Sequence, residues 1–170
     1  MGPDRDGSLA LPLSLRSLLL VLHVLGAVVA LGFSLSYGLW IGRGDAQGPT
    51  ERAFALRTIS WIDRRITTPA YVAQLVTGLL LVATLDWDLL RAAWLEVSLV
   101  LYVALTVLAI AVYAPSFRRQ RALAERIAAG EGGESEYAKA ASAARRWGAV
   151  VTAMTLTILV LMVWKPTLWD

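Results

Sequence analysis

The sequence predicts an all-α protein that crosses a membrane four times, and two observations carry this prediction. The first is composition: 57% of the 170 residues are hydrophobic and 17% are charged, against about 25% charged in average soluble domains. The second is that the apolar residues gather in four runs bounded by charged residues. A helix needs about 20 apolar residues to cross a bilayer core. The expected spans of this single domain, residues 1–170, are 17–41, 66–85, 92–113 and 147–164.

The first span, residues 17–41, is too long for a cleaved signal peptide. It extends over about 25 residues, whereas the apolar region of a signal peptide has about 7–15. Small residues recur in it at every fourth position, a pattern that lets two helix backbones approach closely in lipid. We expect this packing stripe to consist of Gly26, Ala30, Ser34 and Gly38, with His23 beside it and facing protein.

The three later spans carry isolated polar residues. Pro69 is expected in the first turn of the second span, where its missing N–H matters least. Gln74 lies near the middle of the same span and Tyr102 near the middle of the third. Such groups usually form hydrogen bonds between helices. The fourth span adds three more of this kind: Thr152, Thr155 and Thr157.

The distribution of basic residues predicts the orientation. Loops 42–65 and 114–146 hold five and seven Lys and Arg residues, which is twelve of the 16 in the chain. Basic residues concentrate on the cytoplasmic side of membrane proteins. We therefore expect both loops in the cytoplasm of a bacterial cell, and both termini outside its inner membrane.

Both long loops are expected to be helical. In the first loop, an apolar stripe at helical spacing predicts an interfacial helix, formed by Phe54, Thr58, Trp61 and Ile62. The second loop has two Ala-rich, charged segments, 118–128 and 136–146, separated by three glycines. We expect two helical extensions joined by a glycine turn. Plain solvated loops are the alternative.

Several function classes are excluded or disfavoured. The chain has no cysteine, which removes disulfides, thiolate metal sites and cysteine nucleophiles. Its net charge of +3 follows from basic residues at helix ends, so nucleic-acid binding is not expected. No HExxH, GxSxG or P-loop motif occurs. These absences favour a non-enzymatic accessory, transport or structural protein, whose partners are the bilayer and either a second copy or another membrane protein.

A candidate polar site lies toward the outer ends of the spans. His23 is about 8 Å into the first span and Glu96 about 6 Å into the third, at 1.5 Å per residue, and Lys165 follows the fourth. Ionisable residues inside a membrane are functional candidates. Each also has a structural interpretation. His23 can pack by a hydrogen bond, Glu96 suits a helix N-terminus, and Lys165 can extend to the interface.

The order of several short runs resembles a family of bacterial membrane proteins known as domain of unknown function 2269. The resemblance extends over about residues 18–166 and rests on Leu22–Ala27, Trp61–Asp63, Leu75–Leu79, Leu101–Tyr102, Ala114–Pro115 and Leu161–Pro166. It implies a four-helix membrane bundle and no established activity.

The first helix is also similar to that of CopD-type copper-resistance proteins and HemJ-type protoporphyrinogen oxidases. This likeness implies that His23 is an axial ligand of haem b or copper, although the chain has one histidine only. A single histidine requires another type of second ligand, such as Met162 for copper, a five-coordinate haem, or a dimer. No cofactor is expected in the favoured interpretation. A redox protein using His23, and a proton-coupled transporter using His23 and Glu96, are the alternatives.

Overall fold

The computed structural model describes residues 13–84 and 93–166, and all regular structure in these residues is helical. Two short segments, η1 and η2, are π-helical turns within longer helices. The elements are α1 (Leu13–Gln47), α2 (Pro49–Ile62), η1 (Asp63–Thr67), α3 (Thr68–Val82), α5 (Ala93–Leu108), η2 (Ala109–Tyr113), α6 (Ala114–Ala128) and α7 (Glu134–Trp164).

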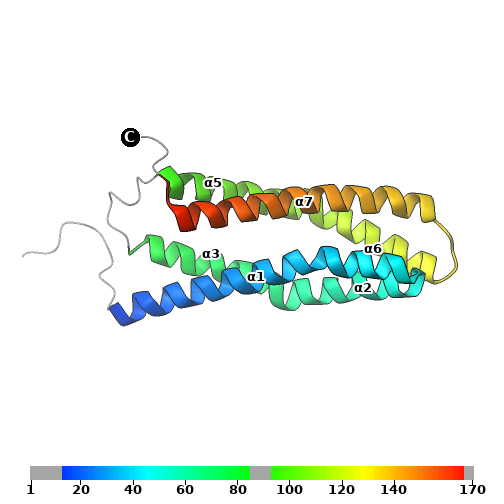
Figure 1. The fold of residues 1–170 in the computed structure, drawn as a ribbon, viewed down its shortest axis with the longest axis horizontal. Coiled ribbons are helices and arrows are strands. Elements are labelled where there is room, and N and C mark those ends of the chain that lie inside the picture. Colours follow the sequence, from blue (N-terminus) through cyan, green and yellow to red (C-terminus); the bar gives the residue numbers. More distant parts are fainter. Residues whose placement is uncertain (1–12, 85–92, 167–170) are drawn as a thin grey trace, which may run out of the picture.

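These elements form four long rods that lie side by side (Figure 1). The rods are α1, α2–η1–α3, α5–η2–α6 and α7, and each is long and apolar enough to cross a membrane. The predicted all-α fold with four membrane-crossing helices is therefore confirmed. We call the end where α1 and α5 begin and α3 and α7 stop the open end. The opposite end, with α2, α6 and the start of α7, is the closed end.

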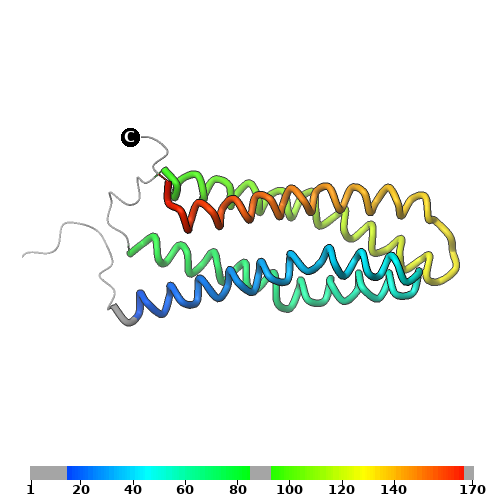
Figure 2. The backbone as a smooth tube through the Cα atoms, in the orientation of Figure 1, coloured from blue at the N-terminus to red at the C-terminus, as the bar shows by residue number. Residues whose placement is uncertain are grey.

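The expected helical loops are also confirmed, because they form the parts of the rods toward the closed end. The turn between α6 and α7 is visible at the far end of the tube in Figure 2. Its three glycines, Gly130, Gly132 and Gly133, have φ of 82°, 75° and 108°. Residues with a side chain rarely adopt this left-handed backbone conformation, so glycine permits the sharp reversal of the chain.

The orientation expected for the first loop is corrected. Helix α2 does not lie flat as an interfacial helix but runs along α1 and also packs against α6 (Figure 1). Phe54 and Trp61 of the predicted stripe are exposed, while Leu56 and Ile59 are buried. Small residues allow this close packing: a Cβ added at Gly44 of α1 would lie 2.9 Å from the Cβ of Ala55.

Both π-turns precede a proline by two residues. Pro69 lies in the first turn of α3, as expected, and Pro115 lies in the first turn of α6. In each case the rod nevertheless continues back through the π-turn into the preceding helix. A proline ring within a helix collides with the carbonyl four residues earlier. The wider π-turn accommodates the ring, because its hydrogen bonds join residues five apart.

Burial divides the molecule along its length. The hydrophobic core lies at the closed end, where α1, α2, α6 and α7 meet. Many large apolar side chains on the rods are exposed, such as Leu39 at 77% and Val163 at 76%, although Leu19, Leu95 and Leu105 are buried outside this core. Exposed apolar surface of this extent marks a face that contacts lipid or a partner rather than water.

Candidate functional site

A cavity of about 580 Å³ lies at the open end, between the α1–α3 pair and the α5–α7 pair. Its lining on α1 extends from Arg16 to Leu31, which is about 22 Å at 1.5 Å per residue. Most lining side chains are aliphatic. The volume falls within the range of about 300–1,000 Å³ typical of small-molecule sites. The cavity is therefore long, apolar and large enough for a ligand.

His23 lines this cavity and is bonded to α3. Its Nδ1 lies 3.1 Å from the backbone oxygen of Gln74 and 3.1 Å from Oγ1 of Thr77. A carbonyl oxygen only accepts, so Nδ1 carries the proton and donates it. Nε2 then accepts from the side-chain amide nitrogen of Gln74, 3.3 Å away. Both ring nitrogens are thus engaged by one neighbouring helix.

Two glycines provide the space for this arrangement. A Cβ added at Gly78 would lie 3.0 Å from Cε1 of His23. A Cβ added at Gly26 would lie 3.0 Å from Oε1 of Gln74. The Oε1 atom is buried and has no hydrogen-bond partner among the described residues. The imidazole and the amide are therefore held between two helices that approach closely.

The expected packing stripe on α1 faces α3 over most of its length. Beyond Gly26, Ala30 is buried, and Ser34 shares a hydrogen bond of 3.2 Å with the Tyr71 hydroxyl. A Cβ added at Gly38 would meet nothing within 4 Å. The side-chain position of Gly38 therefore faces no neighbouring atom, whereas Gly26 and Ser34 contact α3.

The other predicted site residues are divided between the cavity and its surroundings. Lys165 lines the cavity, and its Nζ lies 5.5 Å from the centre of the Trp94 ring. Met162 lines it too. Glu96 is exposed and is not part of the lining. The short outer loop with Asp86, Asp88 and Arg91 lies outside the described residues.

Sequence reasoning missed Arg16, which lines the cavity together with Lys165. We expected Arg16 only to border the first span. Apart from the buried Oε1 of Gln74, the polar side chains of the inner lining form hydrogen bonds within the protein. Tyr102 donates to the backbone oxygen of Tyr71 at 3.0 Å, and Ser98 donates to that of Trp94 at 2.6 Å. The two basic side chains are therefore the charged groups that the described lining offers to a ligand.

The geometry does not fit a haem or copper ion bound to His23 as the residue stands. Nε2 accepts a hydrogen bond from Gln74, so metal ligation would require that amide to move away. The described residues also contain no group of three or more His, Cys, Asp or Glu side chains that could hold a metal. Met162 is the soft donor that shares the cavity with His23.

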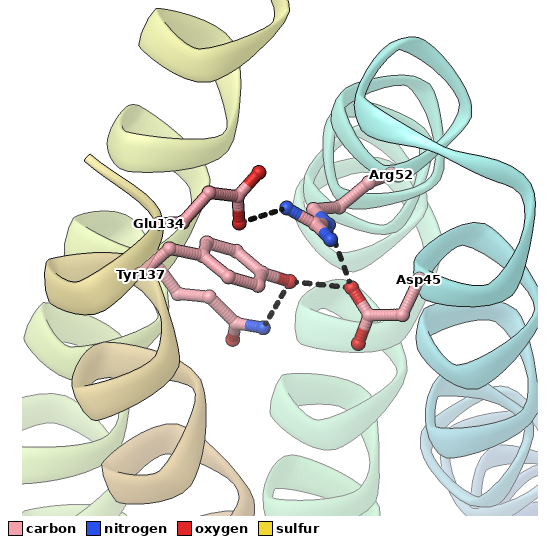
Figure 3. Close-up of polar contacts among 5 residues, drawn as sticks. Asp45, Arg52, Glu134 and Tyr137 are labelled. Carbon is pink, nitrogen blue, oxygen red and sulfur yellow. Dashed lines mark hydrogen bonds and ion pairs between the residues drawn. The ribbon is translucent and has the colours of Figure 1, made fainter. Parts of the chain in front are cut away.

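A second polar cluster, at the closed end, was also missed (Figure 3). Arg52 of α2 forms ion pairs with Asp45 of α1, at 3.0 Å, and with Glu134 of α7, at 2.9 Å. Its guanidinium lies 4.4 Å from the centre of the Tyr137 ring. Tyr137 donates to Asp45 at 2.7 Å and accepts from Gln120 of α6 at 3.2 Å. We call these five residues the closed-end cluster; they join all four rods.

Electrostatics within the closed-end cluster favour a neutral Tyr137. Burial, reinforced by the hydrogen bond to Asp45, raises the pKa of the Tyr137 hydroxyl to about 12. The sequence gives little sign of this cluster, because Asp45 and Tyr137 are 92 residues apart.

Comparisons with known proteins support the expected family. A family model described as "Predicted integral membrane protein (DUF2269)" matches residues 17–166. No curated protein and no solved structure matches the chain. The likeness of the first helix to CopD-type and HemJ-type proteins gains no support from these comparisons.

Proposed function

Because the chain belongs to the DUF2269 family of predicted integral membrane proteins, we propose that it is a non-enzymatic membrane protein that binds a hydrophobic small molecule. The observation that carries this proposal is the apolar cavity of about 580 Å³ at the open end. Binding of this kind suits an accessory or transport role. The exposed apolar faces of the rods contact the bilayer.

The chemistry of the lining supports a ligand with an apolar body. A polar molecule would lose its hydration in this cavity and find few groups to replace it, because most inner polar atoms are already paired and the free Oε1 of Gln74 is itself buried. His23 is bonded to Gln74, and Tyr102 to the backbone of Tyr71. Aliphatic walls instead favour a hydrocarbon in proportion to the area that it buries.

The charge distribution supports an outward-facing cavity. The twelve basic residues of the two long loops lie toward the closed end. The positive-inside bias places that end in the cytoplasm of a bacterial cell. In this orientation the cavity opens toward the outer leaflet of the inner membrane, and the ligand enters from there.

The test identifies, by mass spectrometry, the ligands that purify with the protein. It compares wild type with two variants in which the same enlargement, alanine to phenylalanine, is made at different places. Ala27→Phe adds a ring inside the cavity, because Ala27 is part of the lining. Ala153→Phe adds the same ring on an exposed face of α7. We expect the first to lose a ligand that wild type and the second retain. Equal retention of that ligand by both variants would overturn the proposal.

A haem- or copper-linked redox protein is the second candidate, because His23 and Met162 line the same cavity. The hydrogen bond from Gln74 to Nε2 opposes it. An absorption spectrum and metal analysis of protein from cells supplied with haem and copper distinguish the two. We expect a colourless, metal-free sample. A Soret band that disappears in His23→Ala would replace our proposal with the redox function.

A further inference from the structure

Among the described residues of the cavity lining, the charged ones lie at its mouth and have one sign. Of the described residues that line it, Arg16 and Lys165 are basic and none is acidic. Arg16 lies in the first turns of α1, and Lys165 directly follows the last residue of α7. Both therefore lie where the rods reach the open end, so the described lining presents its positive charge to a ligand at that end.

Lys165 is held in place by its surroundings. Its backbone caps α7 in the left-handed conformation, with φ of 49°, and its N–H donates to the Leu161 oxygen at 2.9 Å. Its ammonium group lies over the ring of Trp94, which begins the lining on α5. This contact between the end of α7 and α5 keeps the exposed ammonium group beside the cavity mouth.

The described residues deeper in the cavity include no charged side chain that could hold a second ionic group. His23, about 10 Å deeper than Arg16 along α1, is committed to Gln74 and Thr77. Tyr71 is committed to Ser34. An ion placed at this depth would lose its hydration without compensation. The cavity therefore has a cationic mouth and an apolar interior.

We propose that the ligand is an amphiphile with an anionic headgroup, phosphate or carboxylate, held by Arg16 and Lys165, and with a hydrocarbon chain in the cavity. This proposal rests on the proposed function and specifies its ligand class. A cationic headgroup is repelled by these two side chains, and a neutral one accepts weaker hydrogen bonds from them than an anion does. Charge-assisted hydrogen bonds from guanidinium and ammonium groups are the strong contacts available to such an anion.

The experiment is a binding titration by native mass spectrometry in a non-ionic detergent, with three probes of equal chain length. These are hexadecyl phosphate, hexadecanoate and hexadecanol. We expect one or both anions to bind at least about tenfold more tightly than the alcohol. Binding of the phosphate alone identifies a lipid phosphate as the ligand class. Tight binding of hexadecanoate extends the class to fatty carboxylates.

Variants of the mouth provide the control. Arg16→Gln combined with Lys165→Gln should reduce the affinity for the anions to that for hexadecanol, while Lys165→Arg should preserve it. Arg43→Gln, near the other end of α1, should change nothing. Equal binding of all three probes to wild type would overturn the headgroup proposal and leave the proposed function standing. If no probe binds and no ligand purifies with the protein, the proposed function fails as well.

Discussion

The closed and open ends of the molecule hold their helices together by different means. At the closed end, Ala53 and Leu56 have no exposed surface, and the closed-end cluster joins all four rods. At the open end, contacts such as His23 with Gln74 join α1 to α3, while a cavity lies between this pair and the α5–α7 pair and is bridged by the hydrogen bond from Tyr102 to Tyr71. The closed end is packed like the core of a soluble protein, and the open end contains a cavity.

This difference indicates a division of roles. Close packing at the closed end fixes the relative positions of the rods, since a packed core deforms little. The open end can then remain separated without loss of the overall fold. Substitutions at the closed end should therefore affect stability more than ligand binding. Substitutions at the cavity should do the opposite.

The largest effect is expected at the core of the closed end. Leu56→Ala removes a side chain with no exposed surface, and such truncations cost about 2–5 kcal/mol of unfolding free energy. Leu39→Ala is the matched control, because Leu39 is 77% exposed. Thermal unfolding in detergent, followed by circular dichroism, measures both. A similar loss of unfolding free energy in the two variants would mean that the closed-end core contributes no more to stability than exposed apolar residues do.

A smaller effect is expected from the closed-end cluster. Arg52→Gln removes two ion pairs and leaves the Asp45 carboxylate with one partner fewer. Because both carboxylates are partly exposed, we expect a loss of about 1–2 kcal/mol. Arg126→Gln removes the exposed pair with Glu131, at 2.9 Å, and should cost less than about 0.5 kcal/mol. Chemical denaturation would show no difference between the variants if the cluster were only a surface feature.

Two glycines inside the long apolar helices, one facing His23 and one facing no neighbour, should respond with opposite sign. Gly78→Ala places a Cβ 3.0 Å from the His23 ring, which two helices hold in position, and should destabilise by about 1 kcal/mol. Gly32→Ala meets no atom within 4 Å and should stabilise by about 0.5–1 kcal/mol through helix propensity. Melting temperatures of both variants decide this. Stabilisation by Gly78→Ala would mean that α1 and α3 are not held closely at His23.

Sequence reasoning succeeded where the relevant signal is local. Apolar length predicted the four membrane-crossing helices, and charge with glycine spacing predicted the helical loops. It failed where the answer depends on which helix faces meet. Arg16 and Lys165 are far apart in the chain, and their shared cavity follows only from how the rods pair.

Glu96 illustrates the same limit. Its depth in the third span suggested a place beside His23, but depth does not fix direction around a helix. The cavity lining on α5 follows the i, i+3 and i+4 spacing of one helix face: Trp94, Leu95, Ser98, Leu99, Tyr102 and Leu105. This stripe is the periodicity of one helix face, and Glu96 lies beside it. The stripe was present in the sequence, and only the structure shows which neighbour it faces.

The smallest effect expected is a change in pH dependence at Tyr137. Folding raises the pKa of the Tyr137 hydroxyl from the ordinary 10.0 to about 12. The folded state therefore favours the neutral hydroxyl. The resulting contribution of Tyr137 to the free energy of unfolding is complete below pH 10 and is lost as the pH rises toward 12.

The variant Tyr137→Phe tests this pH dependence. Its stability at pH 8 is lower than that of wild type, because Gln120 and Asp45 each lose a partner, but its phenyl ring cannot ionise. The difference in melting temperature between wild type and variant should therefore shrink from pH 9 to pH 11. A difference in melting temperature that stays constant with pH would mean that water reaches the closed end before Tyr137 ionises. The closed end would then be less tightly packed, relative to the open end, than the buried residues indicate.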